Sequence, residues 1–438
     1  MRNLIYGVIW ILIYLLIVLA PIIVLMIGPE RPGREIWREF SVALGFAGLS
    51  MMGMQFLLTA RVRPIVRNYG IDVVYHFHRQ ISIVAFLLIL AHPATLFVFS
   101  PGLLNLLNPL TAPARVIFGL ASILLLAVLI FLSLKRLDLK LKYEPWRLTH
   151  GILATLAIIF AMLHVLGVGY YIDTPGKQIL WIVLSVFWIG ALGYVRILKP
   201  LLMLRKPYRI DEVRPERGDA YTLVFKPEGH KGLTFRPGQF AWMTIWSSPY
   251  NIREHPFSFS SSAMQNDRLE LTVKNLGDFT SQVKDIQPGT RAYLDGPYGI
   301  FSIDNYPAES YVFIAGGVGI TPVMSMLRTL ADRRDRRPVI LFYGSKTWED
   351  ATFQEEIDIL KERMNLTIVY VLEEPMDGWE GATGFITAEL IAEHLPENRT
   401  EIYYFMCGPE PMMQAIGSAL DRLGIMPDRI ILEHFSLV

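Results

Sequence analysis

Long apolar runs fill the first 200 residues of the chain and become rare after Pro200. Six of these runs are long enough, or nearly long enough, to cross about 30 Å of hydrocarbon as helices. They cover residues 4–27, 40–60, 81–99, 116–134, 148–172 and 179–195. The pattern predicts a six-helix transmembrane bundle over residues 1–200. The even number of crossings puts both ends of this bundle on one side of the membrane.

The pattern changes after residue 207. Short alternating apolar and polar runs at 221–226, 240–246 and 269–274, separated by Gly, Pro and Asp, predict a small antiparallel β-barrel over residues 207–304. From residue 305 to 438, strand-like runs alternate with helix-like runs. This alternation predicts an α/β domain with a parallel sheet and a nucleotide at the carboxyl ends of its strands. The expected fold is therefore multidomain.

Composition agrees with a chain that is partly embedded in a membrane. The sequence is 52% hydrophobic and 18% charged, with a mean hydropathy of +0.37, which is too apolar for an ordinary soluble protein. The net charge of +1 gives no reason to expect a nucleic-acid partner. Cys407 is the only cysteine, which excludes an intramolecular disulfide and a cysteine-ligated metal site.

Positive charge is divided unevenly between the two ends of the spans. Thirteen Lys and Arg residues lie near span ends on the face that holds the N-terminus, against five on the other face: Arg31, Arg34, Arg38, Arg115 and Lys177. Cytoplasmic loops carry the excess of positive charge, so both termini are predicted to be cytoplasmic in a plasma or cytoplasmic membrane. The first run is too long for a signal peptide and is interpreted as an anchor.

Four histidines recur at one interval within or just before the third and fifth apolar runs. His78 and His92 are fourteen residues apart, and so are His150 and His164. Fourteen residues return a helix to nearly the same face, about 21 Å further along its axis. Both runs point outward, so His78 is expected to pair with His150 at the inner end and His92 with His164 at the outer end. Imidazoles are axial ligands of haem iron, and the pattern predicts two b-type haems.

Other interpretations of these residues stay open. The four histidines could be isolated polar residues that hydrogen-bond between helices. His76 competes for the inner position, but it lies about 160° around the helix from His92. Arg79 and Arg147, beside the inner ligands, could pair with haem propionates or simply follow the positive-inside rule.

The soluble half contains several short motifs in a set order. They are His255-Pro256-Phe257-Ser258, Gly277-Asp278-Phe279-Thr280, Asp295-Gly296-Pro297-Tyr298-Gly299, Gly316-Gly317-Val318-Gly319-Ile320-Thr321-Pro322 and Cys407-Gly408-Pro409-Glu410-Pro411-Met412. Phe257 can stack on an isoalloxazine ring with Ser258 hydrogen-bonded beside it. His255 is placed to hold the pyrophosphate or the ring. Glycines before a helix let phosphates approach backbone amides.

In this order and spacing the motifs resemble the ferredoxin-NADP reductase family, and with the upstream helices they resemble its branch of ferric reductases and NADPH oxidases. The resemblance implies FAD and NADPH (or NADH) as cofactors. The residues expected to bind them are His255, Pro256, Phe257, Ser258, Gly277, Thr280, Gly316, Gly317, Gly319, Thr321, Pro322 and Gly408. The resemblance also implies that Cys407 lies beside the nicotinamide and that Phe435 covers the flavin.

The second strand of the α/β domain is followed by Ser345 and Lys346, where a 2′-phosphate would sit. A basic side chain at this place favours NADPH over NADH, although exposed lysines are common.

The expected function is transmembrane electron transfer by an NAD(P)H-dependent oxidoreductase. NAD(P)H gives a hydride to FAD, and single electrons pass through the inner and outer haems to a small-molecule acceptor outside. Related oxidases carry a second histidine one turn beyond the outer ligand, where this chain has Leu96. This difference favours a ferric chelate as the acceptor over O2, which would give superoxide. Arg31, Arg34, Arg38 and Arg115 could still line an oxygen or anion site.

Two other classes of function are open. The helices could anchor a haem-free flavoreductase that serves a partner protein, or they could form a haem-binding or transport module that the C-terminal half regulates. Membrane lipid is an expected partner. The sequence has no EF-hand loop and no proline-rich or acidic tail, so no obligatory protein partner is expected.

Overall fold

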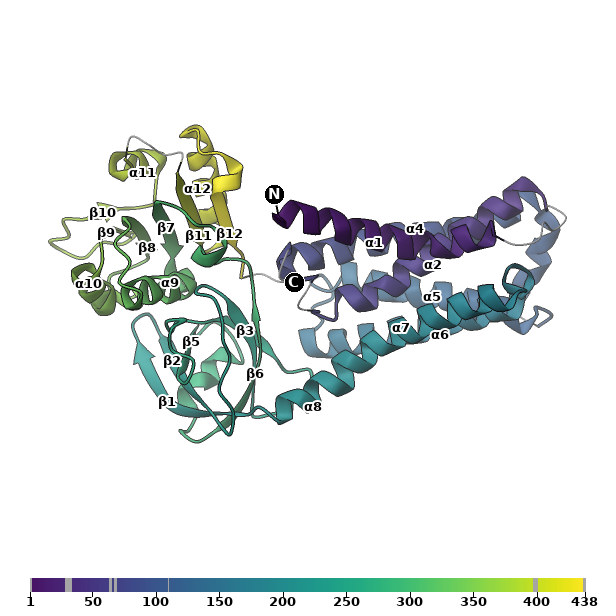
Figure 1. The fold of residues 1–438 in the computed structure, drawn as a ribbon, viewed down its shortest axis with the longest axis horizontal. Helices are drawn as coiled ribbons and strands as arrows, with labels where there is room; N and C mark the ends of the chain where they lie inside the picture. Colours follow the sequence, from purple (N-terminus) through teal and green to yellow (C-terminus); the bar gives the residue numbers. More distant parts are fainter. Residues whose placement is uncertain are drawn as a thin grey trace. The chain divides into compact units, whose positions relative to one another are not determined.

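The computed structural model describes residues 2–27, 34–62, 65–66, 69–108, 110–396 and 401–435, with side chains from residue 7 onward. The chain divides into two compact units, Met1–Pro200 and Leu201–Val438 (Figure 1). Arg31, one of the expected outer cations, lies outside the described residues.

Long helices build the first unit. They are α1 (Arg2–Leu25), α2 (Ile36–Leu58), α4 (Ile71–Phe99), α5 (Ala114–Leu134), α6 (Tyr143–Val168) and α7 (Pro175–Gly193). The described residues contain six helices long and apolar enough to cross a membrane, which confirms the predicted bundle. A π-turn over Tyr194–Leu198 and the short helix α8 (Lys199–Leu204) continue the chain beyond α7. The protein is an integral membrane protein.

The two histidine-bearing helices begin earlier than their apolar runs. α4 begins at Ile71 and α6 at Tyr143, in polar sequence that hydropathy alone excludes. Asp72 and Glu144 lie in the first turns, where a carboxylate is favourable near the positive end of a helix. The early starts place the inner histidine of each helix within regular helix.

Within this unit α2 packs along α4, and α5 packs along α6. Gly48 allows a close approach of the first two, because a Cβ there would lie 2.9 Å from the Ala85 carbonyl oxygen. Ala85 and Ala157, each midway between the two histidines of its helix, are both buried. The histidine-bearing faces of α4 and α6 are therefore turned into the bundle.

A curled antiparallel sheet forms the first part of the second unit. Its strands are β1 (Tyr208–Glu216), β2 (Ala220–Pro227), β3 (Phe240–Ile245), β4 (His255–Ser258), β5 (Leu269–Lys274) and β6 (Arg291–Tyr298), in the order β4-β3-β6-β1-β2-β5. A bridge between Phe259, directly after β4, and Leu271 of β5 draws the two edges together. The inward side chains, including Ile210 and Phe225, form one apolar core. The predicted barrel is confirmed as a half-barrel.

A parallel sheet with flanking helices forms the rest of the unit. Its strands are β7 (Ser310–Gly316), β8 (Val339–Ser345), β9 (Leu366–Leu372), β10 (Ala382–Thr383), β11 (Ile402–Cys407) and β12 (Ile430–Glu433), in the order β10-β9-β8-β7-β11-β12. The helices are α9 (Ile320–Asp332), α10 (Gln354–Arg363), α11 (Ala388–His394) and α12 (Glu410–Arg422). This confirms the predicted α/β domain. The strand order reverses between β7 and β11, whose carboxyl ends border the crevice where such sheets bind ligands.

Candidate cofactor sites

The histidine pairs expected from the sequence meet inside the helical unit. The ring centroids of His78 and His150 are 6.3 Å apart, and those of His92 and His164 are 6.2 Å apart. A metal–imidazole bond is about 2.0 Å long and the ring centre lies about 1.1 Å beyond the nitrogen, so imidazoles on opposite sides of one metal have centroids about 6.2 Å apart. Each pair has this spacing. His76, by contrast, is exposed.

Side-chain hydrogen bonds fix the protonation of the inner pair. His78 Nδ1 lies 2.9 Å from Gln55 Oε1, and His150 Nδ1 lies 3.1 Å from Ser133 Oγ. The Gln55 amide and the Ser133 hydroxyl each donate their own hydrogen to a carbonyl four residues earlier in their helix. Both oxygens can therefore only accept from the imidazoles. Nδ1 carries the hydrogen in each ring, and Nε2 keeps its lone pair.

Backbone carbonyl oxygens also fix which ring nitrogen carries the hydrogen in the outer pair. His92 Nδ1 lies 2.9 Å from the Ser41 carbonyl oxygen, and His164 Nδ1 lies 2.7 Å from the Arg115 carbonyl oxygen. A carbonyl oxygen has no hydrogen to give, so Nδ1 is again the donor. The four imidazoles thus share one tautomer, the one that a metal-ligating Nε2 requires.

The free ring nitrogens fit haem better than a bare metal ion. Nothing within the described ranges donates to or accepts from Nε2 of His78, His92, His150 or His164. The described residues also hold no cluster of three or more His, Cys, Asp or Glu arranged for a metal ion. Two imidazoles per site suit a metal whose other ligands come with its cofactor, as those of haem iron do.

Glycines and a buried indole lie beside the imidazoles of these pairs. A Cβ at Gly45 would lie 3.1 Å from the ring of His92, and a Cβ at Gly119 would lie 2.8 Å from the ring of His164. Both outer imidazoles therefore pack on bare backbone of the neighbouring helix. On the inner side, the Trp146 indole lies 5.3 Å from the His150 ring, and its Nε1 is buried with no partner in the described structure.

The two arginines expected near the inner haem differ in environment. Arg79 is exposed. Arg147 is half-buried, with its guanidinium 6.0 Å from the Tyr143 ring centre. The choice between propionate binding and simple positive-inside placement stays open for both.

A cavity of about 160 Å³ in the second unit gathers many of the residues expected to bind FAD. Strand β4, the turn after β5, the turn after β7 and the C-terminal segment all contribute to its wall. Its lining comprises Phe240, Pro256, Phe257, Ser258, Thr272, Val273, Lys274, Leu276, Thr280, Val318, Thr321, Glu433, His434 and Phe435. Phe257 and Phe435, both expected to contact the flavin, thus line one cavity although they lie far apart in the sequence.

One aromatic residue of this region had no expected role. The ring of Phe279 stacks on that of His255, with centroids 3.9 Å apart and 23° between the planes, and it lies nearly parallel to that of Phe257 at 6.1 Å. His255 is therefore held by an aromatic contact. The only sequence signal for this contact was the place of Phe279 inside the Gly-Asp-Phe-Thr motif.

The turn that carries this motif is closed by Thr280. Its Oγ1 accepts hydrogen bonds from the backbone amides of Leu276 and Gly277, each at 2.9 Å. The helix that was expected to begin here is a short 3₁₀ helix, Thr280–Asp285. Gly277 is exposed, and a Cβ there would have no atom within 4 Å, so its backbone is open to a ligand.

The glycines after β7 divide into two groups. A Cβ at Gly319 would overlap the Cys407 carbonyl oxygen, and a Cβ at Gly316 would overlap the Met412 side chain. These two glycines let the turn after β7 pack against the turn after β11. Gly317 has φ +51° and open space around it, so it is the glycine of this turn that faces outward.

The residues beside these glycines are buried. Cys407 ends β11 and is fully buried, and burial together with the nearby Glu433 carboxylate holds the pKa of its thiol well above the ordinary value. The thiol is therefore neutral and enclosed at the carboxyl end of β11, and its role beside the nicotinamide stays a prediction. Thr321 and Pro322 lie buried in the first turn of α9, and Gly408 follows Cys407 against Met412.

The residues expected at the 2′-phosphate lie at the end of β8. Ser345 is buried and donates to the Thr347 carbonyl oxygen at 2.9 Å. Lys346 is exposed, and its Nζ lies 3.3 Å from Glu374 Oε1. A carboxylate beside the lysine competes with a phosphate for the same charge.

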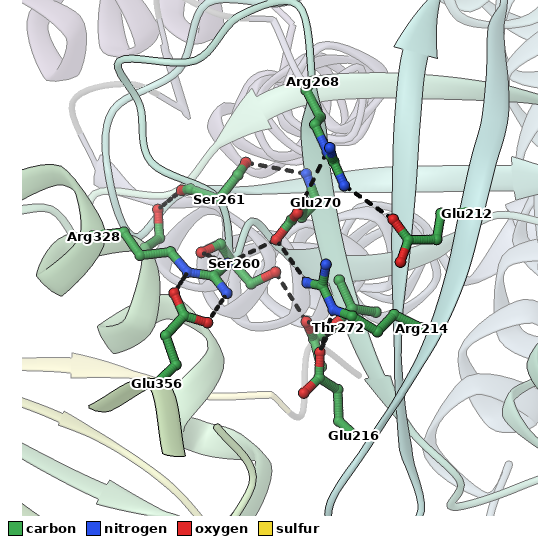
Figure 2. Close-up of polar contacts among 12 residues, drawn as sticks. Glu212, Arg214, Glu216, Ser260, Ser261, Arg268, Glu270, Thr272, Arg328 and Glu356 are labelled. Atoms are coloured by element: carbon green, nitrogen blue, oxygen red, sulfur yellow. Dashed lines mark hydrogen bonds and ion pairs between the residues drawn. The ribbon is translucent and has the colours of Figure 1, made fainter. Parts of the chain in front are cut away.

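A partly buried ion-pair network joins the sheet of the half-barrel to the α/β domain (Figure 2). Arg328 of α9 bonds Glu270 of β5 at 2.8 Å, Glu356 of α10 at 2.7 Å and the Ser260 carbonyl oxygen at 2.8 Å. Burial alone would lower the pKa of Arg328, but these ion pairs outweigh burial and raise it. Sequence reasoning missed this network because its members are far apart in the chain.

Removing Arg328 should loosen this junction. Arg328→Met leaves Glu270 with Arg214 at 3.3 Å as a remaining partner, so we expect a loss of about 3 kcal/mol, at the low end for breaking a buried pair. For a unit of this size, that loss corresponds to a fall of roughly 6–12 °C in the unfolding midpoint. Thermal unfolding of the full chain, monitored by flavin fluorescence, measures this change. Arg268→Met is the control, since Arg268 is 42% exposed and approaches Glu270 only at 3.8 Å. Equal losses in both variants would contradict the assignment.

Comparison with known proteins supports the same organisation. Residues 44–161 match the ferric reductase like transmembrane component, residues 218–302 an FAD-binding domain, and residues 313–417 an oxidoreductase NAD-binding domain. These three matches lie in the order of the domains described above.

Curated relatives resemble about half of the chain. The reductase component of propane 2-monooxygenase from Rhodococcus jostii is 29% identical over 52% of this chain, which spans 63% of that relative. NADH–cytochrome b5 reductase 1 from Arabidopsis thaliana is 31% identical over 37% of this chain and 59% of its own length. Among solved structures, a cytochrome P450 reductase from Amycolatopsis is 25% identical, with a TM-score of 0.47 over 52% of this chain and 69% of its own.

The second unit matches an FAD-binding domain and an oxidoreductase NAD-binding domain, and the helical unit places the protein in a membrane. With a match to a ferric-reductase-like transmembrane component ahead of matches to FAD- and NAD-binding domains, the chain matches the domain organisation of the ferric reductase and NADPH oxidase family.

Proposed function

We propose that this protein carries electrons across the membrane, from NAD(P)H through FAD and two bis-histidine haems to a ferric chelate on the far side. The observation that carries the proposal is the two imidazole pairs with the spacing of bis-histidine sites and four free Nε2 atoms. Bound FAD would take two electrons as a hydride and release them singly, which a one-electron haem requires.

The second unit's own residues would bring the two nucleotide cofactors together. Phe257 and Ser258 come from the half-barrel, whereas Val318 and Thr321 come from the turn after β7, and all four line one cavity. A flavin held by the first two residues would therefore face a nicotinamide entering the crevice at the end of β7. Phe435, in the same wall, is placed to cover the flavin until the nicotinamide displaces it.

Chain topology supports an inward-facing donor side. Six crossings put the second unit on the same side as the N-terminus, and the excess of Lys and Arg on that face makes it cytoplasmic. The pair of His78 and His150 is then the inner site, and the pair of His92 and His164 is the outer site.

The outer end of the bundle suits an anionic acceptor. Arg115 places its carbonyl oxygen on His164, and its exposed side chain lies at the same end of α5. Arg34 and Arg38, one turn apart before and within α2, add cationic groups near Tyr170 and Tyr171. Exposed cations attract anionic ferric chelates, whereas neutral O2 gains nothing from them.

Spectroscopy of the solubilised full chain tests the proposal. Under anaerobic conditions NAD(P)H should reduce two haems per protein, and a ferric chelate should reoxidise them. Fast superoxide release in air with negligible chelate reduction would make O2 the acceptor instead. A preparation without a haem Soret band would overturn the proposed haem pathway and favour a haem-free flavoreductase.

Nucleotide preference can be tested at Lys346. Lys346→Gln should raise KM for NADPH about threefold to tenfold and leave KM for NADH unchanged, because only NADPH carries a 2′-phosphate for the lysine to bind. Glu374→Gln should lower KM for NADPH, since it frees Lys346 from the ion pair at 3.3 Å. Steady-state flavin reduction with both nucleotides measures these effects. Parallel changes for NADH and NADPH would contradict the assignment.

A further inference from the structure

The inner and outer histidine pairs differ in what accepts their Nδ1 hydrogens. The outer rings donate to main-chain carbonyls, those of Ser41 and Arg115, and the Ser41 hydroxyl oxygen is a second acceptor at 2.9 Å from His92 Nδ1. The inner rings donate to side chains, the amide oxygen of Gln55 and the hydroxyl oxygen of Ser133. At the inner site both hydrogen bonds therefore depend on residue type, whereas at the outer site only the contact of His92 with the Ser41 hydroxyl does.

Both inner acceptors are locked in orientation. Gln55 Nε2 donates to the Met51 carbonyl oxygen at 2.7 Å. If the amide were flipped, its NH2 group would face the Nδ1 hydrogen of His78 and its oxygen would face the Met51 carbonyl oxygen, and both contacts would be unfavourable. Ser133 Oγ donates to the Leu129 carbonyl oxygen at 2.8 Å in the same four-residue pattern. Gln55 is only 6% exposed, so water does not compete for its oxygen.

We infer that Gln55 and Ser133 are positioning residues that set the redox potential of the inner haem independently of the outer haem. This inference rests on the proposed binding of haem to the two histidine pairs. An imidazole that donates from Nδ1 is a more basic ligand through Nε2. A more basic ligand stabilises ferric iron relative to ferrous iron, which lowers the midpoint potential.

The two residues should contribute unequally. An amide oxygen at 2.9 Å accepts more strongly than a hydroxyl oxygen at 3.1 Å. Gln55→Met keeps the length of the side chain and removes its acceptor, so the ferric-to-ferrous equilibrium of the inner haem should shift about tenfold toward ferrous, or about 59 mV upward. Ser133→Ala should shift the same haem in the same direction by about threefold.

The chain offers a matched control and a rescue. Ser122 also lies buried in α5 and donates to the Ala157 carbonyl oxygen at 2.8 Å, without touching an imidazole, so Ser122→Ala should leave both potentials unchanged. Gln55→Glu restores an oxygen acceptor next to His78. Its inner-haem potential should lie at or below that of the original protein.

Potentiometric titration of the haem absorption in the full-length holoprotein tests this inference. The step that is missing in His78→Ala identifies the inner haem. An upward shift of that step alone in Gln55→Met and Ser133→Ala supports the inference, and Ser133→Ala decides it if Gln55→Met fails to retain haem. Unmoved potentials, an equal shift of the outer haem, or the same shift in Ser122→Ala would overturn it. Absence of haem from the original protein would instead overturn the proposed function.

Discussion

His92→Ala is expected to lower the haem content from two to one per chain and to stop electron delivery to external acceptors. His92 and His164 would together hold the outer haem of the proposed pathway, and one imidazole cannot supply both protein ligands. Loss of a second-sphere partner of a metal ligand already costs about 10–100-fold, so loss of the ligand itself should cost more than about 100-fold in acceptor reduction. Reduction of FAD by NAD(P)H takes place in the second unit and should be unchanged.

His76→Ala is the control for this variant. His76 lies on the same helix but is exposed, and its ring does not meet His150. It should keep two haems and full acceptor reduction. Haem quantitation, a reduced-minus-oxidised spectrum and a ferric-chelate assay on both variants suffice. Two intact haems in His92→Ala, or a lost haem in His76→Ala, would show that the pairing is wrong.

The sequence predicted the architecture well because its patterns are long. Each membrane run exceeds the length of an ordinary strand, and the interval between His78 and His92 is repeated between His150 and His164. A helix converts such an interval into a shared face without any knowledge of neighbouring residues. The alternation of strands and helices in the second unit likewise predicts the fold from pattern alone, because each strand–helix unit spans about thirty residues.

Contacts between distant segments could not be predicted in this way. Gln55 and Ser133 lie on helices other than those of the histidines they bind, and nothing in their local sequence marks them as acceptors. The same holds for Arg328, whose partners Glu270 and Glu356 come from a strand and from another helix. Which of these distant residues contact each other depends on how the helices and strands pack, and a single sequence does not show that packing.

The glycine-rich turn lies where it was predicted, and the structure adds a packing constraint to its predicted role in binding a dinucleotide. Gly316, Gly317 and Gly319 were expected to admit a dinucleotide to the backbone. In the structure Gly317 faces open space, while Gly316 and Gly319 admit the turn after β11. Close packing of two turns at the switch point of the sheet therefore constrains this motif in addition to any ligand.

Gly319→Ala should abolish efficient hydride transfer for this steric reason. Gly319 has φ −60°, which any residue adopts, so backbone strain is not the obstacle. The added Cβ would overlap the Cys407 carbonyl oxygen, and main chain cannot move aside as a side chain can. Overpacking of this kind costs about 1–3 kcal/mol. The turns after β7 and β11 would separate, moving the nicotinamide from the flavin, and we expect a roughly 100-fold slower reduction of FAD by NAD(P)H.

Gly417→Ala separates this effect from the general consequence of replacing a glycine. Gly417 lies in α12 of the same domain, and a Cβ there would have no atom within 4 Å. Alanine in a helix interior is favoured over glycine by about 0.5–1 kcal/mol, so this variant should be at least as stable and should reduce FAD at the original rate. Anaerobic stopped-flow bleaching of the flavin measures both variants. Because FAD is held by the half-barrel, Gly319→Ala should keep its flavin; rapid flavin reduction in it would mean that the two turns need not touch for hydride transfer.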